Sequence, residues 1–331
     1  MKTVRFVITA MAAFALSISL AFSQEFTLRL SHQFPPAHHS ALRLEQFKKD
    51  VAAHTHGRVE VQIFGAAQLY KPGQQHAAVA SGEIEAAAIV NLQWGNVIPE
   101  MSVTLIPYLM SSPASQKAFI HSPAAKLLDE KIREKGVVNI AWIVDTNDLI
   151  FTSSNRLLRS PADFQGVRIR GFNKLFDSGL KAMGAAPVAM PGSEVYQALQ
   201  TGVLDAGVTG VAAAYSRKFH EVQKYGAAST VFLAFDNLVV NPNWWDNLPA
   251  ELQAGLQRAA DNAVQSSLST HEGVRSQDIK NLVDSGMEVV VLDAAQVEEL
   301  RQAMQPAVRK AFLDSAGDDG ERLLALIEQL R

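Results

Sequence analysis

Two segments far apart in the chain follow one plan, and this repeat constrains the fold most strongly. Residues 78–86 (AVASGEIEA) and 198–206 (ALQTGVLDA) both read as a helix end, a glycine, an acidic residue and the start of a buried strand. Each follows a strand and a turn rich in glycine and proline, at 65–73 and 187–192. A repeated supersecondary unit indicates repeated architecture. We therefore expect two similar α/β lobes, one built on each segment, with a cleft between them.

The remaining hydrophobic pattern alternates between short strands and amphipathic helices. Proline and glycine separate the elements, and Ser40 is expected to cap the first helix. The predicted strands are 26–30, 59–63, 84–90, 137–144, 166–171 and 230–240, and the predicted helices are 40–57, 74–80, 115–136, 219–225 and 296–331.

A further helical pattern at 249–286 is interrupted around 266–273, and a helix this long can serve both lobes and bend where they hinge. With 331 residues, 48% of them hydrophobic, the chain can fill two lobes. We predict an α/β fold of mixed sheets flanked by helices, with a long bent helix spanning both lobes. Lobe I is expected to comprise 24–147 and 236–275, and lobe II 148–235 and 276–331.

The N-terminus has the pattern of an export signal. Lys2 and Arg5 precede an apolar run at 6–22, and Ala21 and Ser23 have the spacing of a cleavage site. The run is short for a membrane anchor, and nothing later in the chain is long enough to span a bilayer. The chain has no cysteine, so no lipid-modified cysteine tethers it. We predict a signal peptide at 1–23, cleaved near Ser23, and a periplasmic protein.

Composition and motifs argue against several classes of function. The net charge is -3 and the basic residues are scattered, which gives no electrostatic case for nucleic acid. Without cysteine there is no disulfide, thiolate nucleophile or cysteine metal site. The sequence has no phosphate-binding loop, dinucleotide fingerprint or nucleophile elbow, and we expect no cofactor. His220-Glu221 and His271-Glu272 begin a zinc-protease motif but lack its second histidine.

Two patterns leave alternatives open. The histidines of 31–39 (SHQFPPAHH) lack metal-site spacing, so we favour a solvated loop over a metal site. Asp145 with Asp148 could form a general acid/base pair, which would make the protein a hydrolase on a two-lobed fold. We favour a hydrogen-bonding role at the cleft rim, and hence a binding protein that is not an enzyme. A ligand-sensing partner of a receptor is a third alternative.

Arg170 is the lead candidate for a ligand-binding residue. In 166–171 (GVRIRG), Val167 and Ile169 face one side of a short strand, and Arg168 and Arg170 face the other. Ligands of open α/β sheets bind in the crevice beyond the strand ends. An arginine at the end of a buried strand needs an anionic partner there, although a surface arginine or a structural salt bridge explains the local pattern equally well.

Other polar and aromatic residues also fall at expected strand ends or inside the strands that border the cleft. Together with Arg170 they are the residue types expected in a small-ligand site, which is mostly apolar with a few polar groups that fix the orientation of the ligand. The further candidates are His32, Asn91, Gln93, Trp94, Asp145, Asn147, Phe172, Asn173, Thr209, Asp236 and Asn237.

Six stretches together carry a resemblance to a known family. They are 67–70 (AQLY), 106–108 (IPY), 161–170 (PADFQGVRIR), 193–205 (SEVYQALQTGVLD), 220–225 (HEVQKY) and 245–249 (WDNLP). On these stretches the chain resembles the substrate-binding proteins of TRAP transporters, the DctP family, over its whole mature length.

The resemblance implies two lobes, joined by strands and a long bent helix, that close on an organic acid and pass it to a membrane permease. It also implies that Arg170 clamps the ligand carboxylate. A guanidinium matches a carboxylate with two parallel hydrogen bonds, which lysine cannot reproduce. We expect a monomer.

The chain departs from the family pattern at two places. Leu149, flanked by Asp148, stands where many relatives have an arginine or lysine, and Val208-Thr209 stands where many have Glu-Asn. A second ligand carboxylate would then lack a partner, so we expect a monocarboxylate such as a sugar acid or a hydroxy or keto acid. A C4-dicarboxylate binder is the alternative, in which case the second cation would come from His32, His38 or Lys174.

Overall fold

The computed structural model describes residues 24–110 and 112–330, without the side chains of Pro113 and of 270–275. The predicted signal peptide at 1–23 lies outside the described residues. A nine-stranded mixed sheet has the order β2-β1-β3-β8-β4-β7-β5-β6, and β9 pairs with β8. The strands are β1 (Phe26–His32), β2 (Val59–Phe64), β3 (Ala86–Val90), β4 (Val138–Ser153), β5 (Arg168–Gly171), β6 (Ala186–Ala189), β7 (Ala206–Gly210), β8 (Tyr225–Val240) and β9 (Glu288–Val291).

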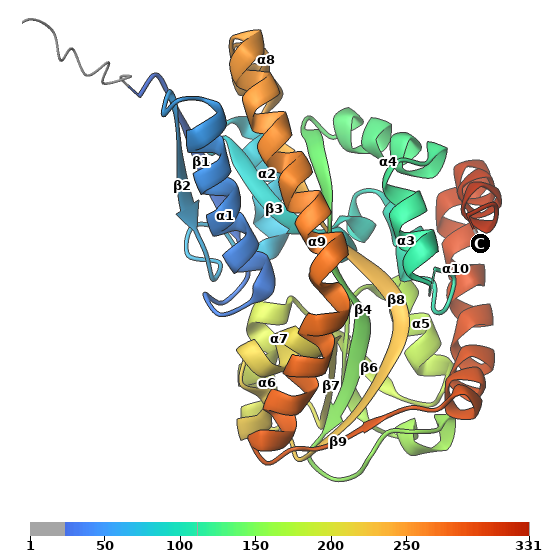
Figure 1. Ribbon diagram of the computed structural model, residues 1–331. Coiled ribbons are helices and arrows are strands. Elements are labelled where there is room, and N and C mark those ends of the chain that lie inside the picture. Colours follow the sequence, from blue (N-terminus) through green and yellow to red (C-terminus); the bar gives the residue numbers. More distant parts are fainter. Residues whose placement is uncertain (1–23, 111, 331) are drawn as a thin grey trace, which may run out of the picture.

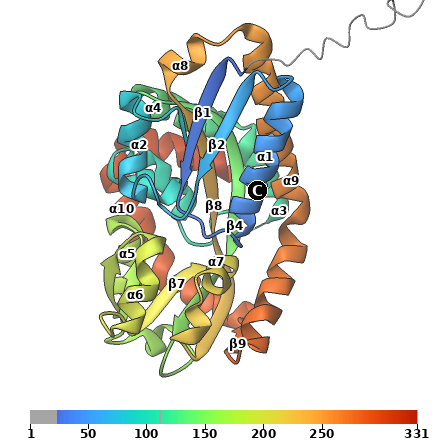
Figure 2. The same ribbon diagram turned by 90° about the vertical axis from the view of Figure 1, so that its left-hand side faces the viewer.

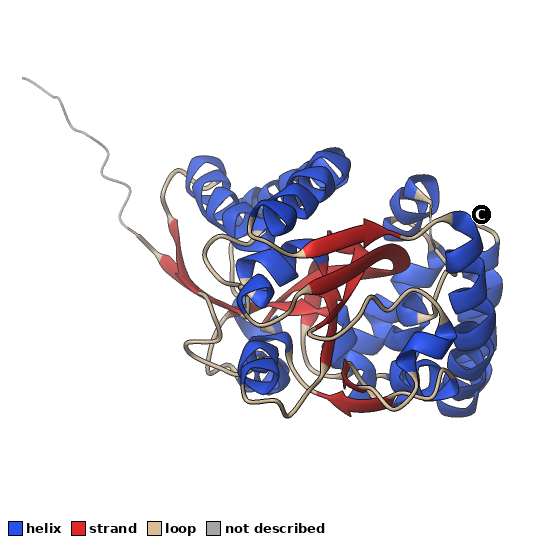
Figure 3. Cartoon of the chain, turned by 90° about the horizontal axis from the view of Figure 1, so that it is seen from below, coloured by secondary structure: helices blue, strands red, loops and turns tan. Residues whose placement is uncertain are grey.

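Helices cover both faces of this sheet (Figure 3). The α-helices are α1 (His39–His54), α2 (Pro72–Ser81), α3 (Pro113–Ile120), α4 (Pro123–Glu134), α5 (Lys174–Ala182), α6 (Val195–Gln200), α7 (Val211–Ser216), α8 (Pro242–Asp246), α9 (Ala250–Asp284) and α10 (Ala294–Glu328). The 3-10 helices are η1 (Asn91–Asn96), η2 (Pro99–Leu105), η3 (Pro161–Phe164), η4 (Gly192–Glu194) and η5 (Phe219–Glu221).

The two ends of the sheet belong to two lobes (Figure 2). The first lobe is built on β1, β2 and β3, and the second on β5, β6 and β7; neighbouring strands within each end run parallel. The strands β4 and β8, each 16 residues long, pair antiparallel through both lobes. The helix α9 contacts α1 in the first lobe and α7 in the second (Figure 1). The predicted fold class is confirmed, although α9 is helical throughout and has no interruption at 266–273.

The sequence repeat corresponds to a structural repeat. Gly82 follows α2 with φ 78°, and Gly202 follows the end of α6 with φ 72°. Glycine adopts this left-handed conformation readily, which lets the chain leave a helix and turn back. The next turn is closed in the same way in both copies, by Ile84 N–H donating to Ala78 O and by Leu204 N–H donating to Ala198 O. The strands β3 and β7 then begin at the same point of each lobe.

The acidic residue of each repeat pairs with an arginine on the adjacent strand. Glu85 accepts hydrogen bonds from the backbone N–H, Nε and Nη2 of Arg29, at 2.7–2.8 Å. Asp205 accepts from the same three groups of Arg168. A carboxylate that binds both a guanidinium fork and a backbone amide fixes its neighbour in register. These pairs therefore lock the start of each lobe's central strands.

Aromatic clusters fill the core on both sides of the long strands. In the first lobe, fully buried Phe235 stacks on Phe119 at 5.1 Å between ring centroids and meets the edge of Trp142 at 5.4 Å. In the second lobe, Phe232 meets Phe176 edge-on at 5.3 Å. Phe232 and Phe235 both lie on β8, so this strand is anchored in each lobe. Between these anchors lies the crossing point, the place where β4 and β8 pass from one lobe to the other.

The crossing point is irregular. The strand predicted to end at Val144 continues through 145–148 as part of β4, so its predicted end is wrong. The pairing with β8 shifts register between Val144 and Thr146 and again between Thr146 and Asp148. Such bulges re-aim side chains and let strands bend without breaking the sheet. Polar residues can therefore sit in the middle of a continuous strand and face the space between the lobes.

Three helix predictions also need correction. The segment 115–136 forms two helices, because Ser122 caps a new helix that Pro123 begins. The segment 219–225 forms one 3-10 turn, after which β8 starts at Tyr225. The N-cap of α1 is His38, whose Nδ1 accepts the backbone N–H of Ser40 at 3.1 Å.

The two longest helices, α9 and α10, are too polar to cross a bilayer, and no shorter helix in the described part of the chain qualifies. The helix α10 contains Pro306 and has a non-helical residue, Gly317, at φ 54° and ψ -139°. It packs on α5 of the second lobe, and its later residues Leu323, Leu324 and Ile327 join the core of the first lobe.

Asp129 of α4 is an acidic group under the first-lobe sheet. Its Oδ1 accepts hydrogen bonds from Asn139 Nδ2 and Trp142 Nε1, both at 2.8 Å. Burial raises the pKa of Asp129 to about 6 from 3.8, despite these hydrogen bonds. A carboxyl with a raised folded-state pKa contributes full stability below the pKa of the free group, and loses it as the pH rises through the folded-state value.

Asp129→Asn should therefore raise the free energy of unfolding by up to about 3 kcal/mol at about pH 7.5, and change it little at about pH 4. Asparagine keeps an oxygen acceptor for both donors but cannot ionise. Urea unfolding at the two pH values measures the difference. Asp261→Asn, an exposed carboxylate in the same surface groove, is the control and should have no effect at either pH. An equal effect of Asp129→Asn at both pH values would contradict the prediction.

Candidate ligand-binding site

A cavity lies between the lobes, at the place where the paired strands β4 and β8 pass from one lobe to the other. It leaves about 30 Å³ for the centres of water-sized molecules, which is room for about two waters. The lobes touch across it: Lys71 Nζ pairs with Glu194 at 3.4 Å, and Asn173 Nδ2 donates to Leu92 O at 3.5 Å. The lining residues are Gln33, Phe34, His38, Val90, Leu92, Asp145, Thr146, Leu149, Arg170, Phe172, Gly192, Thr209, Gly210, Ala213, Arg217, Phe232 and Ala234.

Arg170 enters the cavity from the C-terminal end of β5 and is 3% exposed. Its Nη1 donates to Val208 O at 2.8 Å and its Nε to Met190 O at 3.2 Å. The guanidinium lies 4.5 Å from the ring centroid of Phe172, within cation–π range. Burial, and then the charge of Arg217, lower its pKa to about 9. Arg170 is therefore still charged at neutral pH, and the carboxylate of Asp177 acts on it through space.

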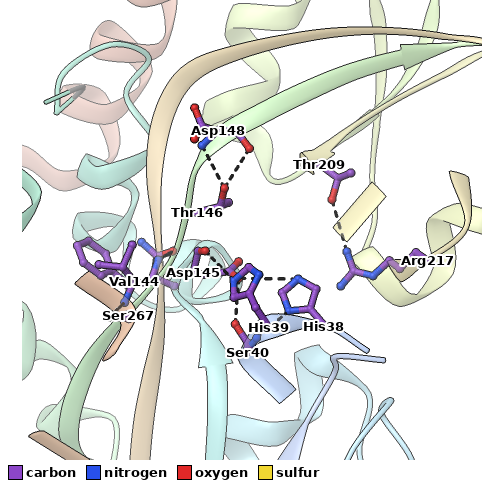
Figure 4. A network of polar contacts seen from close by, with 12 residues as sticks. His38, His39, Ser40, Val144, Asp145, Thr146, Asp148, Thr209, Arg217 and Ser267 are labelled. Atoms are coloured by element: carbon purple, nitrogen blue, oxygen red, sulfur yellow. Dashed lines mark hydrogen bonds and ion pairs between the residues drawn. The ribbon is translucent and has the colours of Figure 1, made fainter. Parts of the chain in front are cut away.

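Arg217 is a second guanidinium of the second lobe, partly buried at the C-cap of α7. Its Nη1 donates to Thr209 Oγ1 at 3.4 Å, and its Nε has no hydrogen-bond partner among the described residues. Burial lowers its pKa to about 10, and the charges of Asp145 and Asp236 oppose the shift. Both arginines thus converge on the end of β7, where Figure 4 shows Arg217 beside Thr209.

Sequence reasoning missed Arg217 because it fell in an assumed loop before a predicted helix. A usable signal existed: the apolar segment 211–216 follows the strand end at Gly210 directly, and Arg217 is the first charged residue after it. Of the residues named for a second cation, His38 lines the cavity, and His32 and Lys174 do not. Arg217 lines it as well.

Asp145 faces the cavity from the bulged part of β4. Its Oδ1 accepts from Ser40 Oγ at 3.1 Å and lies 3.3 Å from His39 Nε2 and 4.0 Å from His38 Nε2 (Figure 4). Burial alone would raise the pKa of Asp145, but the hydrogen bonds from His39 and Ser40 hold it below its usual range. Asp145 is therefore an ionised acceptor and a weak base.

Asp236 and Arg43 lie behind Ser40. Burial, followed by the charge of Asp145, raises the pKa of Asp236 well above its usual value, because two adjacent buried carboxylates cannot both ionise cheaply. Burial lowers the pKa of Arg43, and both carboxylates oppose the shift. The Nε and Nη1 atoms of Arg43 have no hydrogen-bond partner among the described residues. The pair Asp145 and Asp236 thus shares one proton beside several guanidinium groups.

His38, His39 and Asp145 lie close enough together to suggest a metal site. The Nδ1 of His38 accepts the Ser40 backbone N–H, so the proton of the neutral ring is on Nε2, the atom that faces Asp145. Burial lowers the pKa of His38 well below 6.5, which keeps the ring neutral. His39 Nε2 donates to Asp145 O at 2.9 Å and carries its proton there. With both facing nitrogens protonated, the cluster suits hydrogen bonding and does not fit a metal ion.

Four of the residues proposed from the sequence line the cavity together: Arg170, Phe172, Asp145 and Thr209. Three others hold the surrounding structure. Asn91 donates to Thr104 and accepts from Phe235 N–H, Asn173 caps α5, and Trp94 is packed in the first-lobe core.

The remaining candidates are buried or partly buried outside the lining. His32 packs at the end of β1 and burial lowers its pKa to about 4, so it is neutral. Asn237 lies toward the C-terminal end of β8 with both side-chain polar atoms unpartnered among the described residues. Gln93 lies on η1, Asn147 in the bulged part of β4, and Asp236 behind Ser40. Gln33 lines the cavity with its Oε1 unpartnered in the described structure, and was not predicted.

Comparison with known proteins finds one family across the chain. The model of a family described as bacterial extracellular solute-binding protein, family 7 (DctP), matches residues 30–315. A C4-dicarboxylate-binding periplasmic protein, DctP of Rhodobacter capsulatus, is 30% identical over 264 residues, which cover 78% of this chain and 79% of that protein.

Solved structures show the same likeness. A TRAP periplasmic solute-binding protein from Desulfovibrio salexigens with bound orotic acid has a TM-score of 0.86 and 28% identity, and covers 92% of this chain and 98% of its own. One from Rhodoferax ferrireducens with bound malonate has a TM-score of 0.84 and 26% identity, with the same coverage. The similarity therefore extends over nearly the whole of each chain.

Proposed function

Because the chain belongs to the DctP family of extracellular solute-binding proteins, we propose that it captures a small organic acid in its cleft and delivers it to a TRAP transporter. The observation that carries this proposal is Arg170, a buried charged guanidinium in a cavity between two lobes. Its fixed hydrogen bonds to Val208 O and Met190 O leave the remaining guanidinium N–H groups for a ligand carboxylate.

The other lining residues would orient the rest of the acid. Asp145 and Thr209 can bond hydroxyl groups, and Gln33 can donate or accept with its amide. Phe172 and its apolar neighbours would cover the carbon skeleton. The acids named for the two solved relatives, orotic acid and malonate, both carry carboxylates.

Several further features belong to the same proposal. We assign 24–147 and 236–275 to one lobe and 148–235 and 276–331 to the other, with the end of α10 packing back onto the first. Residues 1–23 would act as an export signal cleaved near Ser23, which suits the periplasmic family. The protein would act as a monomer and return its ligand unchanged, since Asp145 is a weak base and Asp148 does not line the cavity.

Ligand binding should stabilise the protein and close its lobes. Without an anion, Arg170 and Arg217 are better hydrated with the lobes apart, so we expect a more open ligand-free form. A thermal-shift screen over carboxylic acids would identify the ligand, whose binding adds about 2.7 kcal/mol of stability at a hundred times the dissociation constant. The amide analogue of each hit is the control.

Small-angle scattering with the identified acid should show compaction, and NMR of the recovered acid should show no chemical change. If no acid in the screen raised the melting temperature, the proposed function would be wrong. Turnover of the acid would show that the protein is an enzyme.

A further inference from the structure

We propose that Arg217, seated against Gly192, is a second anion-binding residue and makes the cleft select compact diacids over monocarboxylates. The inference rests on the proposed function and names the class of acid. It replaces the expectation of a monocarboxylate, which depended on the absence of a second cation near Leu149.

The first observation is that Arg217 is partly buried and has few partners. It has one long hydrogen bond, to Thr209 Oγ1, and an unpartnered Nε in the described structure. Asp145 and Asp236 act on it only through space, since neither forms an ion pair within 4.0 Å of it. Arg170, by contrast, has two carbonyl partners and an aromatic ring. A partly buried guanidinium with so few partners is available to an anion that enters the cavity.

The second observation is the space that the chain keeps for this side chain. A Cβ added to Gly192 would lie 2.6 Å from Arg217 Nη1 and 2.8 Å from its Cζ. The φ of Gly192 is outside the left-handed range, so the backbone itself would accept any residue. The guanidinium end of Arg217 therefore lies where a side chain at 192 would be, and a larger residue there would displace it. Both residues line the cavity, so this fit holds Arg217 at the ligand.

The third observation is the balance of charge around the cavity. Arg170, Arg217 and the adjoining Arg43 are positive, and the coupled carboxylates Asp145 and Asp236 share a single negative charge. The neutral ring of His38 adds none. Asp177, which acts on Arg170 through space, has a pKa raised only to about 6 and is ionised at neutral pH, so one positive charge remains in excess and the cavity attracts anions.

The geometry also sets the size of the acid. Both guanidinium groups are held at the end of β7, Arg170 through Val208 O and Arg217 through Thr209 Oγ1. Consecutive residues hold them, so two carboxylates joined by a short carbon chain can reach both.

The test compares diacids with their monoamides by calorimetry. Succinate and succinamate, and malonate and malonamate, are matched in size and differ by one charge. The wild-type protein should bind its preferred diacid at least about 30-fold more tightly than the monoamide, and Arg217→Met should remove most of that preference. Gly192→Ala should reduce the preference in the same direction by displacing Arg217. Arg168→Met, which loses an exposed ion pair on β5, is the matched control and should keep it.

Thermal unfolding of the ligand-free variants separates binding from structural support. Arg217→Met should melt at the same temperature as wild type or higher, because it removes a partly buried charge that has few partners. Lower stability with an unchanged diacid preference would assign Arg217 a structural role and overturn the inference. Equal wild-type affinity for diacid and monoamide would overturn it as well. If Arg170→Ala still abolished binding in that case, the proposed function would stand without it.

Discussion

Arg170→Ala should weaken binding of the organic acid by roughly 30-fold to several thousand-fold. The substitution leaves a ligand carboxylate buried in a closed cleft without its guanidinium partner, a loss of about 2–5 kcal/mol. Arg170→Lys should recover little, because an ammonium cannot hold Val208 O, Met190 O and a carboxylate in one plane. Isothermal calorimetry with the acid found in the screen measures both variants.

Arg168→Ala is the matched control for this experiment. Arg168 lies two positions earlier on the same strand, but it is half-exposed and pairs with Asp205 at the surface. Its loss should leave affinity within a few-fold of wild type and cost little stability, as for other exposed ion pairs. If Arg170→Ala bound the acid as well as Arg168→Ala does, the carboxylate clamp would have to lie elsewhere in the cleft.

Phe235→Ala should lower the free energy of unfolding by about 3–5 kcal/mol. Phe235 is fully buried between Phe119 and Trp142 on β8, where the first-lobe core meets the crossing point. Truncation removes the stacked ring and leaves a cavity that the sheet cannot close, since β8 is paired on both sides. Urea unfolding followed by circular dichroism measures the loss.

Two control variants test whether the loss of stability comes from removing the buried ring. Phe235→Leu keeps much of the volume and should cost clearly less than the alanine variant. Val291→Ala removes an apolar side chain that is 54% exposed, and should stay within about 0.5 kcal/mol of wild type. A loss below about 1 kcal/mol for Phe235→Ala would show that the aromatic cluster is not a main source of first-lobe stability.

The fold was largely predictable from the sequence because its signals are local. The helix–glycine–acid–strand repeat predicted the two lobes, and the structure confirms its glycines at positive φ. The continuous β4 was not predictable in this way. The residues 145–148 look like a loop, and only the pairing of this stretch with β8, far along the chain, makes it a bulged strand.

In the candidate site, too, residues with a local sequence signal could be predicted and residues placed by distant parts of the chain could not. Arg170 could be proposed because its position follows from the alternation of one short strand. Trp94 and Asn91 follow a strand in the same manner, but the turns of η1 direct Trp94 into the core and Asn91 toward Thr104. Arg217 depends on the short helix α7, on Thr209 and on the missing side chain at Gly192, and no single stretch of sequence contains all three.

The strands β4 and β8 run through both lobes, and this sharing also determines when each lobe can form during folding. β3 of the first lobe pairs with the end of β8, through Ala86 with Val240 and Val90 with Asp236. A growing chain that has made β1, β2 and β3 therefore lacks the neighbour that completes their sheet until it has made almost the whole second lobe. Pairings between residues distant in sequence slow folding, because the entropy of closing a long loop is lost before the stabilising contacts form. We conclude that no single cut can divide this chain into two halves that each fold alone.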